Sequence, residues 1–238
     1  MSSLWEILSE NFWMFTEAAT VTLELTAVSL FFATFIGLFF AFMKISRVRV
    51  LNLIADGYIG LIRGLPLIVQ LMFLYFGISS IVTLPRFWAG SVALAIHSGA
   101  YVAEIFRGAI QSIDKGQVEA AKSLGMKQSL LMRRVILPQA ALRAIPPIGN
   151  QFIIGLKDSS LVAYLGVLEL YGTALLIQAR NFKPFETYLV AGFYYLAMVI
   201  VFTVLLRKLE NRLAVTTRPG GNGTKPKQHR VAHGEAAA

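Results

Sequence analysis

The chain has 238 residues, of which 56% are hydrophobic and 15% charged, and its mean hydropathy is +0.63. Soluble domains are about 45–50% apolar and about 25% charged, so this composition excludes an ordinary soluble domain and a disordered chain. The absence of cysteine excludes a disulfide scaffold, thiol catalysis and Cys-ligated metal. The net charge of +9 fits either nucleic-acid binding or the basic loops of a membrane protein, so the positions of the charges must decide.

Five apolar stretches are long enough to cross a bilayer, which requires about 20 residues of helix. They lie at 18–43, 53–81, 87–106, 145–165 and 188–206. A sixth stretch, 167–179, is shorter, and we expect it to be a partly embedded external segment in which Glu169 is solvated. The predicted fold class is all-α, an integral membrane helical bundle with about five transmembrane helices.

The basic residues favour one side of this bundle. Seventeen of the 22 Lys and Arg residues lie at 44–49, 107–143 and 207–230, and three lie in the segments on the opposite side. By the positive-inside rule the N-terminus is external and the C-terminus cytoplasmic, as an odd number of spans also requires. Topology in a lipid bilayer thus explains the charge, and no nucleic-acid partner is predicted.

Three regions follow from this pattern. Residues 1–15 are predicted to be an external N-terminal segment, and residues 16–212 a single transmembrane domain. Residues 213–238 are rich in Gly, Pro, Lys and Ala without an apolar period. We therefore expect them to form a disordered cytoplasmic tail.

The loop between the third and fourth spans, about 112–140, has a helix–bend–helix pattern. Asp114 or Gly116 can start a short helix that runs through Leu124, and Gly125 ends it because glycine adopts the left-handed conformation without steric cost. A second helix is predicted over 127–137, ending near Pro138. The product is a bent, basic knob suited to the groove of a partner. An ordinary amphipathic interfacial hairpin is the alternative.

At these residues the chain resembles a family. Glu119-Ala120-Ala121, Gly125 and Ile136-Leu137-Pro138 match the EAA loop of bacterial ABC importer permeases. The segments 62–70, 101–108, 111–116 and 156–161 are similar to the polar amino acid subfamily, which serves histidine, glutamate, glutamine, arginine and opines. The resemblance covers about 16–212 and implies the transmembrane domain of a type I ABC importer.

The resemblance also implies partners and a mechanism. Such permeases pair with an identical or homologous permease over two ATP-binding cassette subunits in the bacterial cytoplasmic membrane, and an extracytoplasmic binding protein delivers the amino acid. The loop is then the element that couples ATP hydrolysis to transport, through the residues Glu119, Ala120, Ala121, Gly125, Leu137 and Pro138.

The energy source must be another molecule, because the sequence has no GxxxxGK[ST] phosphate-binding motif. We expect this chain to bind no cofactor or metal, to be no enzyme, and to rely on partner subunits that hydrolyse ATP with Mg²⁺. An ion-coupled secondary carrier is the alternative, with Glu104, Asp158 and His97 as ion sites. An intramembrane enzyme built on the same residues has neither a metal-ligand spacing nor a nucleophile–base pair to support it.

Polar groups within the spans mark a candidate substrate path, because a charge in mid-bilayer requires a partner or water. His97, Tyr101 and Glu104 share one face of the third span. Alternatively, Glu104 pairs with Arg107, His97 is a satisfied core histidine and Tyr101 packs with its hydroxyl satisfied.

Two further groups complete the candidate path. A zwitterionic amino acid needs an acceptor for its ammonium and a donor for its carboxylate, and the fourth span offers Lys157, Asp158, Ser159 and Ser160. Alternatively, Lys157 and Asp158 neutralise each other. In the second span Arg63 and Gln70 share a face and lie on either side of Pro66, which is expected to kink the helix. Alternatively, Arg63 extends to the cytoplasmic interface and does not line the path.

Overall fold

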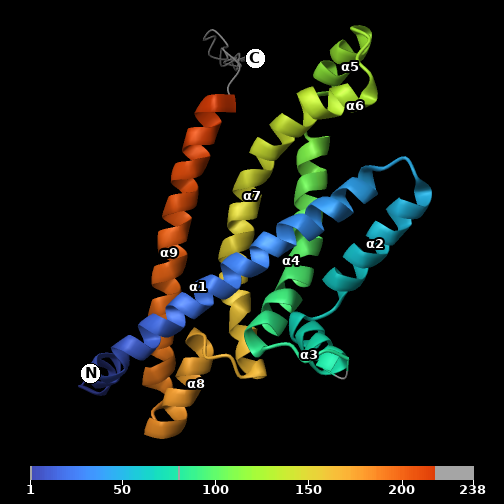
Figure 1. Cartoon of the computed structure of the whole chain (residues 1–238). Helices are drawn as coiled ribbons and strands as arrows, with labels where there is room; N and C mark the ends of the chain where they lie inside the picture. Colours follow the sequence, from blue (N-terminus) through green and yellow to red (C-terminus); the bar gives the residue numbers. More distant parts are fainter. Residues whose placement is uncertain (1, 80, 218–238) are drawn as a thin grey trace, which may run out of the picture.

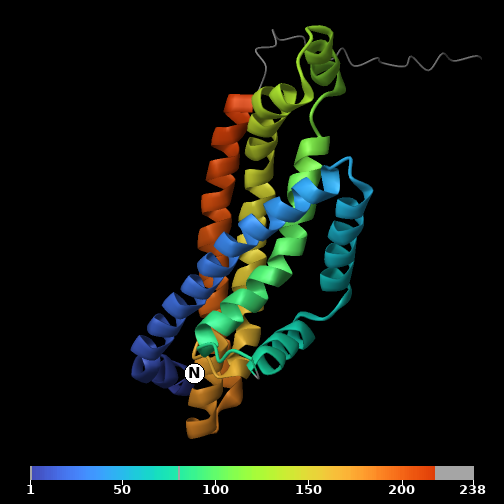
Figure 2. The same ribbon diagram turned by 45° about the vertical axis from the view of Figure 1, so that its right-hand side comes forward.

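The computed structural model describes residues 2–79 and 81–217, and in these ranges the chain is a bundle of helices without strands (Figure 1). Helices α5 and α6 project at one end, which we call the loop end. Helices α3 and α8 lie at the opposite end, where α1 also begins (Figures 1 and 2). The three basic segments identified in the sequence begin at the ends of α1, α4 and α9 that face the loop end. The described parts of these segments, up to residue 217, start on one side of the bundle, as the sequence predicts.

Helix α1 (Ser2–Ile45) crosses helix α4 (Arg86–Gln111) along much of its length. The crossing is tight: a Cβ on Gly37 would lie 2.5 Å from the Val102 side chain and 2.9 Å from the backbone nitrogen of Ala103. Helix α1 continues through the predicted boundary at residue 16, with a kink at Asn11 (φ −113°, ψ 15°). Residues 2–15 therefore belong to the same helix as the first span.

The second predicted span consists of two helices, α2 (Arg49–Gly64) and α3 (Leu67–Ser79), which meet at an angle of 107°. Leu65 between them is extended (φ −106°, ψ 143°), and Pro66 cannot donate a backbone hydrogen bond. The break predicted at Pro66 is confirmed, but it is a sharp turn and not a kink. We call the junction of α2 and α3 the elbow.

The loop end contains α5 (Lys115–Ser123), α6 (Gln128–Leu131), a π-helical turn (Met132–Ile136) and the start of α7 (Leu137–Asp158). The prediction that the second loop helix ends near Pro138 is wrong. Pro138 lies in the first turn of α7, where a missing N–H costs little, and the preceding π turn shifts the hydrogen-bond register. The chain therefore continues from the loop into the next span without interruption.

A 3₁₀ segment (Ser159–Leu165) ends this span, and helices α8 (Leu170–Asn181) and α9 (Pro184–Thr217) follow. Residues 213–217 of the predicted tail form the last turn of α9, and the rest of the tail lies outside the described residues. Within the described residues, three helices, α1, α4 and α9, are long and apolar enough to cross a membrane. Two bent pairs, α2 with α3 and the helical run Gln128–Leu165 with α8, raise the number to as many as five if each pair is one span.

Candidate substrate path and coupling loop

The backbone at the loop end closes its sharp bend with local hydrogen bonds. The Asp114 carboxylate caps α5 by accepting from the Gly116 N–H at 2.6 Å. Gly125 adopts φ +77°, its N–H donates to the Lys122 carbonyl, and the N–H of Met126 donates to the Ala121 carbonyl at 3.1 Å. These two bonds are the glycine-terminated Schellman arrangement, so the predicted start and stop of α5 are confirmed.

We call the segment from α5 to the π turn, Lys115–Ile136, the knob. The predicted coupling residues lie partly on its surface, partly in its interior and partly at the start of α7. The side chain of Ala121 is buried in an apolar cluster with Leu131 and Ile136, and this cluster holds α5 against the start of α7. Glu119, Ala120, Gly125 and Pro138 are exposed, and Leu137 is half-buried. Leu124, which the sequence pattern did not single out, is 83% exposed at the bend and gives the knob an apolar tip.

Polar contacts fasten the knob to the two long helices that flank it. The Gln139 amide of α7 donates to the Gln117 side chain of α5 at 2.7 Å. The Arg143 guanidinium of α7 donates to the backbone carbonyl and the hydroxyl of Ser112, directly after α4. These bonds join α5 to α7, and α7 to the end of α4.

At the elbow, the structure brings together four of the predicted path residues. The Gln70 amide nitrogen donates to the carbonyls of Ile62 and Leu65, and the amide oxygen lies 3.1 Å from Nδ1 of His97 on α4. The Arg63 guanidinium lies over the Tyr101 ring, 5.3 Å from its centroid. The rings of His97 and Tyr101 are 5.2 Å apart. Gln70 and His97 are both buried, whereas Arg63 is exposed.

Glu104 belongs to a separate ionic network nearer the loop end. Arg107 donates to both of its carboxylate oxygens, with Nη2 2.6 Å from Oε2, so the predicted pair is confirmed. The sequence analysis missed two members: Lys44 of α1 lies 3.4 Å from Glu104 and also pairs with Asp56 of α2. Their separation along the chain gives no local signal of the contact, because it depends on how three helices meet.

The residues predicted in the fourth span lie where α7 passes into the 3₁₀ segment. Lys157 is exposed and Asp158 half-buried. The hydroxyls of Ser159 and Ser160 donate to the carbonyls of Leu156 and Lys157, at 2.8 and 2.7 Å, and so satisfy the last turn of the helix. No hydrogen bond joins this group to the residues at the elbow within the described ranges.

The prediction that Glu169 is solvated is wrong. Its side chain is fully buried and caps α8 by accepting from the N–H groups of Tyr171 and Gly172, while the Tyr195 hydroxyl of α9 donates to Oε2 at 2.7 Å. An acidic residue just before a helix is a capping signal, since a carboxylate can accept from the free N–H groups of the first turn. Its contact with Tyr195 could not be inferred from sequence spacing.

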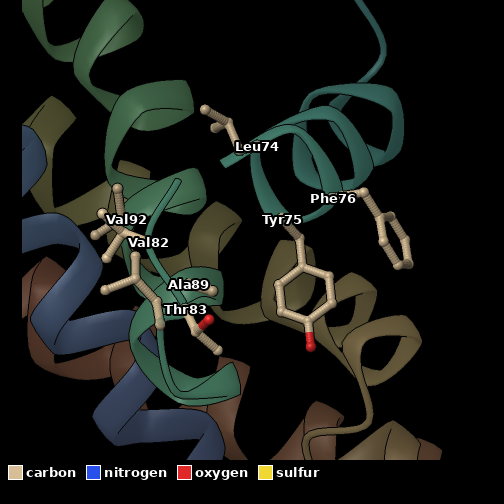
Figure 3. Close-up of a pocket in the computed structure, with 8 residues that line it drawn as sticks. Leu74, Tyr75, Phe76, Val82, Thr83, Ala89 and Val92 are labelled. Atoms are coloured by element: carbon tan, nitrogen blue, oxygen red, sulfur yellow. The ribbon is translucent and has the colours of Figure 1, made fainter. Parts of the chain in front are cut away.

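Two apolar cavities flank α3. One, of about 330 Å³, lies at the elbow and is lined by Leu61, Ile62, Leu65, Val69, Gln70, Phe73, Leu74 and Ile96. The other, of about 200 Å³, lies between α3 and the start of α4, with Tyr75 and Thr83 as its polar members (Figure 3). Gln70 lines the cavity at the elbow, whereas none of the predicted path residues lines the other cavity. No group of three potential metal ligands occurs within the described ranges.

Comparison with known proteins places the chain in a family. Residues 33–215 match the binding-protein-dependent transport system inner membrane component family. The chain belongs to this family. Its members are membrane permease subunits of ABC importers and are not themselves catalytic, so the chain is a multi-pass inner-membrane protein that works with ATPase and permease partners.

Individual relatives agree with this placement. The chain is 39% identical over 202 residues to the glutamine transport system permease protein GlnP of Escherichia coli K12, covering 84% of this chain and 92% of the relative. It is 36% identical over 199 residues to the arginine transport system permease protein ArtQ of Bacillus subtilis, covering 83% and 91%.

A solved structure confirms the predicted fold class. A crystal structure of an amino acid ABC transporter with histidines matches with a TM-score of 0.82 and 41% identity, covering 86% of this chain and 96% of that chain. The fold is therefore the transmembrane domain of a type I ABC importer.

Proposed function

We propose that this permease imports a polar amino acid, driven by two ATPase subunits that engage the knob at the loop end. Support for the substrate class comes from relatives whose names specify glutamine and arginine and that align over more than four-fifths of the chain. A second permease, identical or homologous, completes the path. An extracytoplasmic binding protein delivers the amino acid at the end that carries α3 and α8.

The arrangement of the knob supports its role in coupling. Its surface carries Glu119, Ala120 and the apolar tip Leu124, while its buried apolar cluster and the bond from Gln139 to Gln117 hold α5 against the start of α7. Nucleotide binding to the ATPases biases the knob between two positions, and α4 and α7 follow, which alternates access to the path. ATP and Mg²⁺ are bound by the ATPase subunits, and this chain contributes no cofactor.

The basic residues support the orientation. All three basic segments start at the loop end, so this end faces the cytoplasm, the N-terminus lies outside and the C-terminus inside. The path itself is assigned to two groups: Arg63, Gln70, His97 and Tyr101 at the elbow, and Lys157, Asp158, Ser159 and Ser160 at the end of α7. Glu104 holds three helices together beside this path.

Uptake by the reconstituted complex tests the proposal. Vesicles containing the permease, ATPase and binding protein should accumulate a labelled polar amino acid with internal ATP, and competition by each of the twenty amino acids identifies the substrate. Ionophores should leave uptake intact. Uptake that requires an ion gradient and continues without ATP would instead establish a secondary carrier.

The coupling role is tested by Glu119→Ala, with Ser123→Ala on the same exposed helix as the matched control. Glu119→Ala should preserve insertion and basal ATP hydrolysis but lower uptake about tenfold, because it alters the surface that meets the ATPase. Equal uptake in both variants would contradict the role of Glu119.

The path assignment is tested by Asp158→Asn, with Glu17→Gln at an exposed position of α1 as its control. Loss of the carboxylate charge should weaken the apparent affinity for the transported amino acid while complex assembly is retained. An unchanged apparent affinity would remove Asp158 from the path.

A further inference from the structure

The elbow poses a hydrogen-bonding problem that its backbone cannot solve. Helix α2 ends at Gly64, Leu65 is extended and Pro66 has no N–H, so carbonyls in the last turn of α2 lose their helical partners. In a membrane no bulk water replaces these partners, and an unsatisfied carbonyl is costly. Side chains or neighbouring helices must therefore supply the missing donors.

Gln70 supplies two of them. Its Nε2 lies 2.6 Å from the Ile62 carbonyl and 2.8 Å from the Leu65 carbonyl, and its side chain is 5% exposed. The amide has two N–H donors and one oxygen acceptor. The reverse orientation would place the amide oxygen against two carbonyl oxygens, so the contacts determine which atom is the nitrogen.

This orientation also determines the proton on His97. The Gln70 oxygen lies 3.1 Å from Nδ1 of His97 and is an acceptor, so Nδ1 must carry a hydrogen for the bond to form. In the uncharged ring the other nitrogen, Nε2, then has no hydrogen and is an acceptor. Within the described ranges no side chain donates to Nε2.

We propose that Gln70 is a positioning residue with two linked tasks: it closes the elbow, and it holds His97 as the Nδ1–H tautomer so that Nε2 accepts a hydrogen bond from the transported ligand. The ligand group is a donor, and the ammonium of an amino acid has the required chemistry. This last part rests on the proposed function, whereas the closure and the tautomer rest on the contacts alone.

Nitrogen-15 NMR of labelled histidine measures the tautomer directly. The chain has three histidines, and replacing His229 and His233 with glutamine leaves His97 as the only signal when this chain alone carries the label. The complete complex should show a protonated Nδ1 and an unprotonated Nε2. A spectrum with the proton on Nε2 would overturn the proposal, and this readout does not depend on transport.

Two substitutions separate the tasks of Gln70. Gln70→Glu keeps an acceptor for Nδ1–H but loses the donors to Ile62 and Leu65, so the proton on Nδ1 should be retained. Gln70→Leu loses both and should shift the proton toward Nε2 and lower uptake about tenfold. Gln178→Leu, a half-buried position on α8, should change neither. An unchanged tautomer in Gln70→Leu would contradict the positioning role.

The ligand class is tested by adding L-glutamine or L-arginine to the histidine-labelled complex. The cognate amino acid should shift the Nε2 resonance in the wild type but not in Gln70→Leu. A complex that imports either probe without any shift at Nε2 would overturn the acceptor role. If neither probe nor any other amino acid is imported, the proposed function fails, while the tautomer result stands by itself.

Discussion

Two of the sharp breaks between helices, those at Gly125 and at Pro66, are closed in different ways. At Gly125 the bend is closed by backbone hydrogen bonds within five residues, from Met126 to Ala121 and from Gly125 to Lys122. At Pro66 the backbone leaves carbonyls open, and a side chain four residues later closes them while it contacts α4. The first break is a local structure, whereas the second depends on the packing of three helices.

Because the two breaks are closed differently, we expect them to behave differently when the helices move. In the proposed function, a knob with its own hydrogen bonds moves as one body with the ATPase that engages it. The elbow includes a contact with His97 of another helix, so we expect its geometry to depend on the position of that helix. Substitutions can distinguish the break that is closed locally from the one that is closed by packing.

The largest effect is expected at the local break, for Gly125→Val. The left-handed backbone conformation at position 125 costs about 1–2 kcal/mol for a residue with an ordinary side chain, and more for a β-branched residue such as valine. The knob should lose its bend, and uptake should fall at least about tenfold with insertion retained. Gly125→Asn is the matched control, since asparagine tolerates this conformation, and it should retain most uptake. Normal uptake in Gly125→Val would show that the bend is not required.

An intermediate effect is expected for Glu104→Gln, which tests how far tertiary contacts support the region between the breaks. The change removes the carboxylate that Arg107 and Lys44 share, and Lys44 keeps only Asp56. Hydrogen bonds to charged groups contribute about 1.5–3 kcal/mol each. Because Glu104 is partly exposed, we expect the free energy of unfolding to fall by about 1–2 kcal/mol. Thermal unfolding of the purified protein measures this change.

Controls for Glu104 use the same measurement. Glu17→Gln, at an exposed position of α1, should leave the unfolding temperature unchanged. In the double variant Glu104→Gln/Arg107→Gln, the destabilisation should be less than the sum of the two single changes, since the pair interacts directly. Strict additivity would indicate that the bonds between Glu104 and Arg107 contribute nothing.

The smallest effect is expected for Pro66→Ala. If Gln70 and the packing against α4 hold the elbow, restoring an N–H at position 66 should not straighten it, and stability should change by less than about 1 kcal/mol, largely through the unfolded chain. Spin labels on α2 and α3 should report an unchanged distance. A lengthened distance in the single variant would mean that Pro66, and not Gln70, creates the bend.

Predictions from the sequence were confirmed where the contacts join residues that are close together along the chain. Asp114 and Gly125 define α5 through neighbours within a few residues, and Glu104 pairs with Arg107 one turn away. The predictions were wrong where a local rule was correct but its context differed. Pro138 begins a helix instead of ending one because a π turn precedes it, and Glu169 caps α8 from a buried position.

The sequence by itself determined that the chain is a helical membrane protein, where its apolar segments and basic loops lie, and which loop is bent. These properties depend on composition, on the length of apolar runs and on hydrogen bonds between near neighbours. The tertiary structure alone decided that Gln70 meets His97, that Lys44 and Asp56 join Glu104, and that Tyr195 reaches Glu169. Those contacts join separate helices, and their geometry is established only when the helices pack.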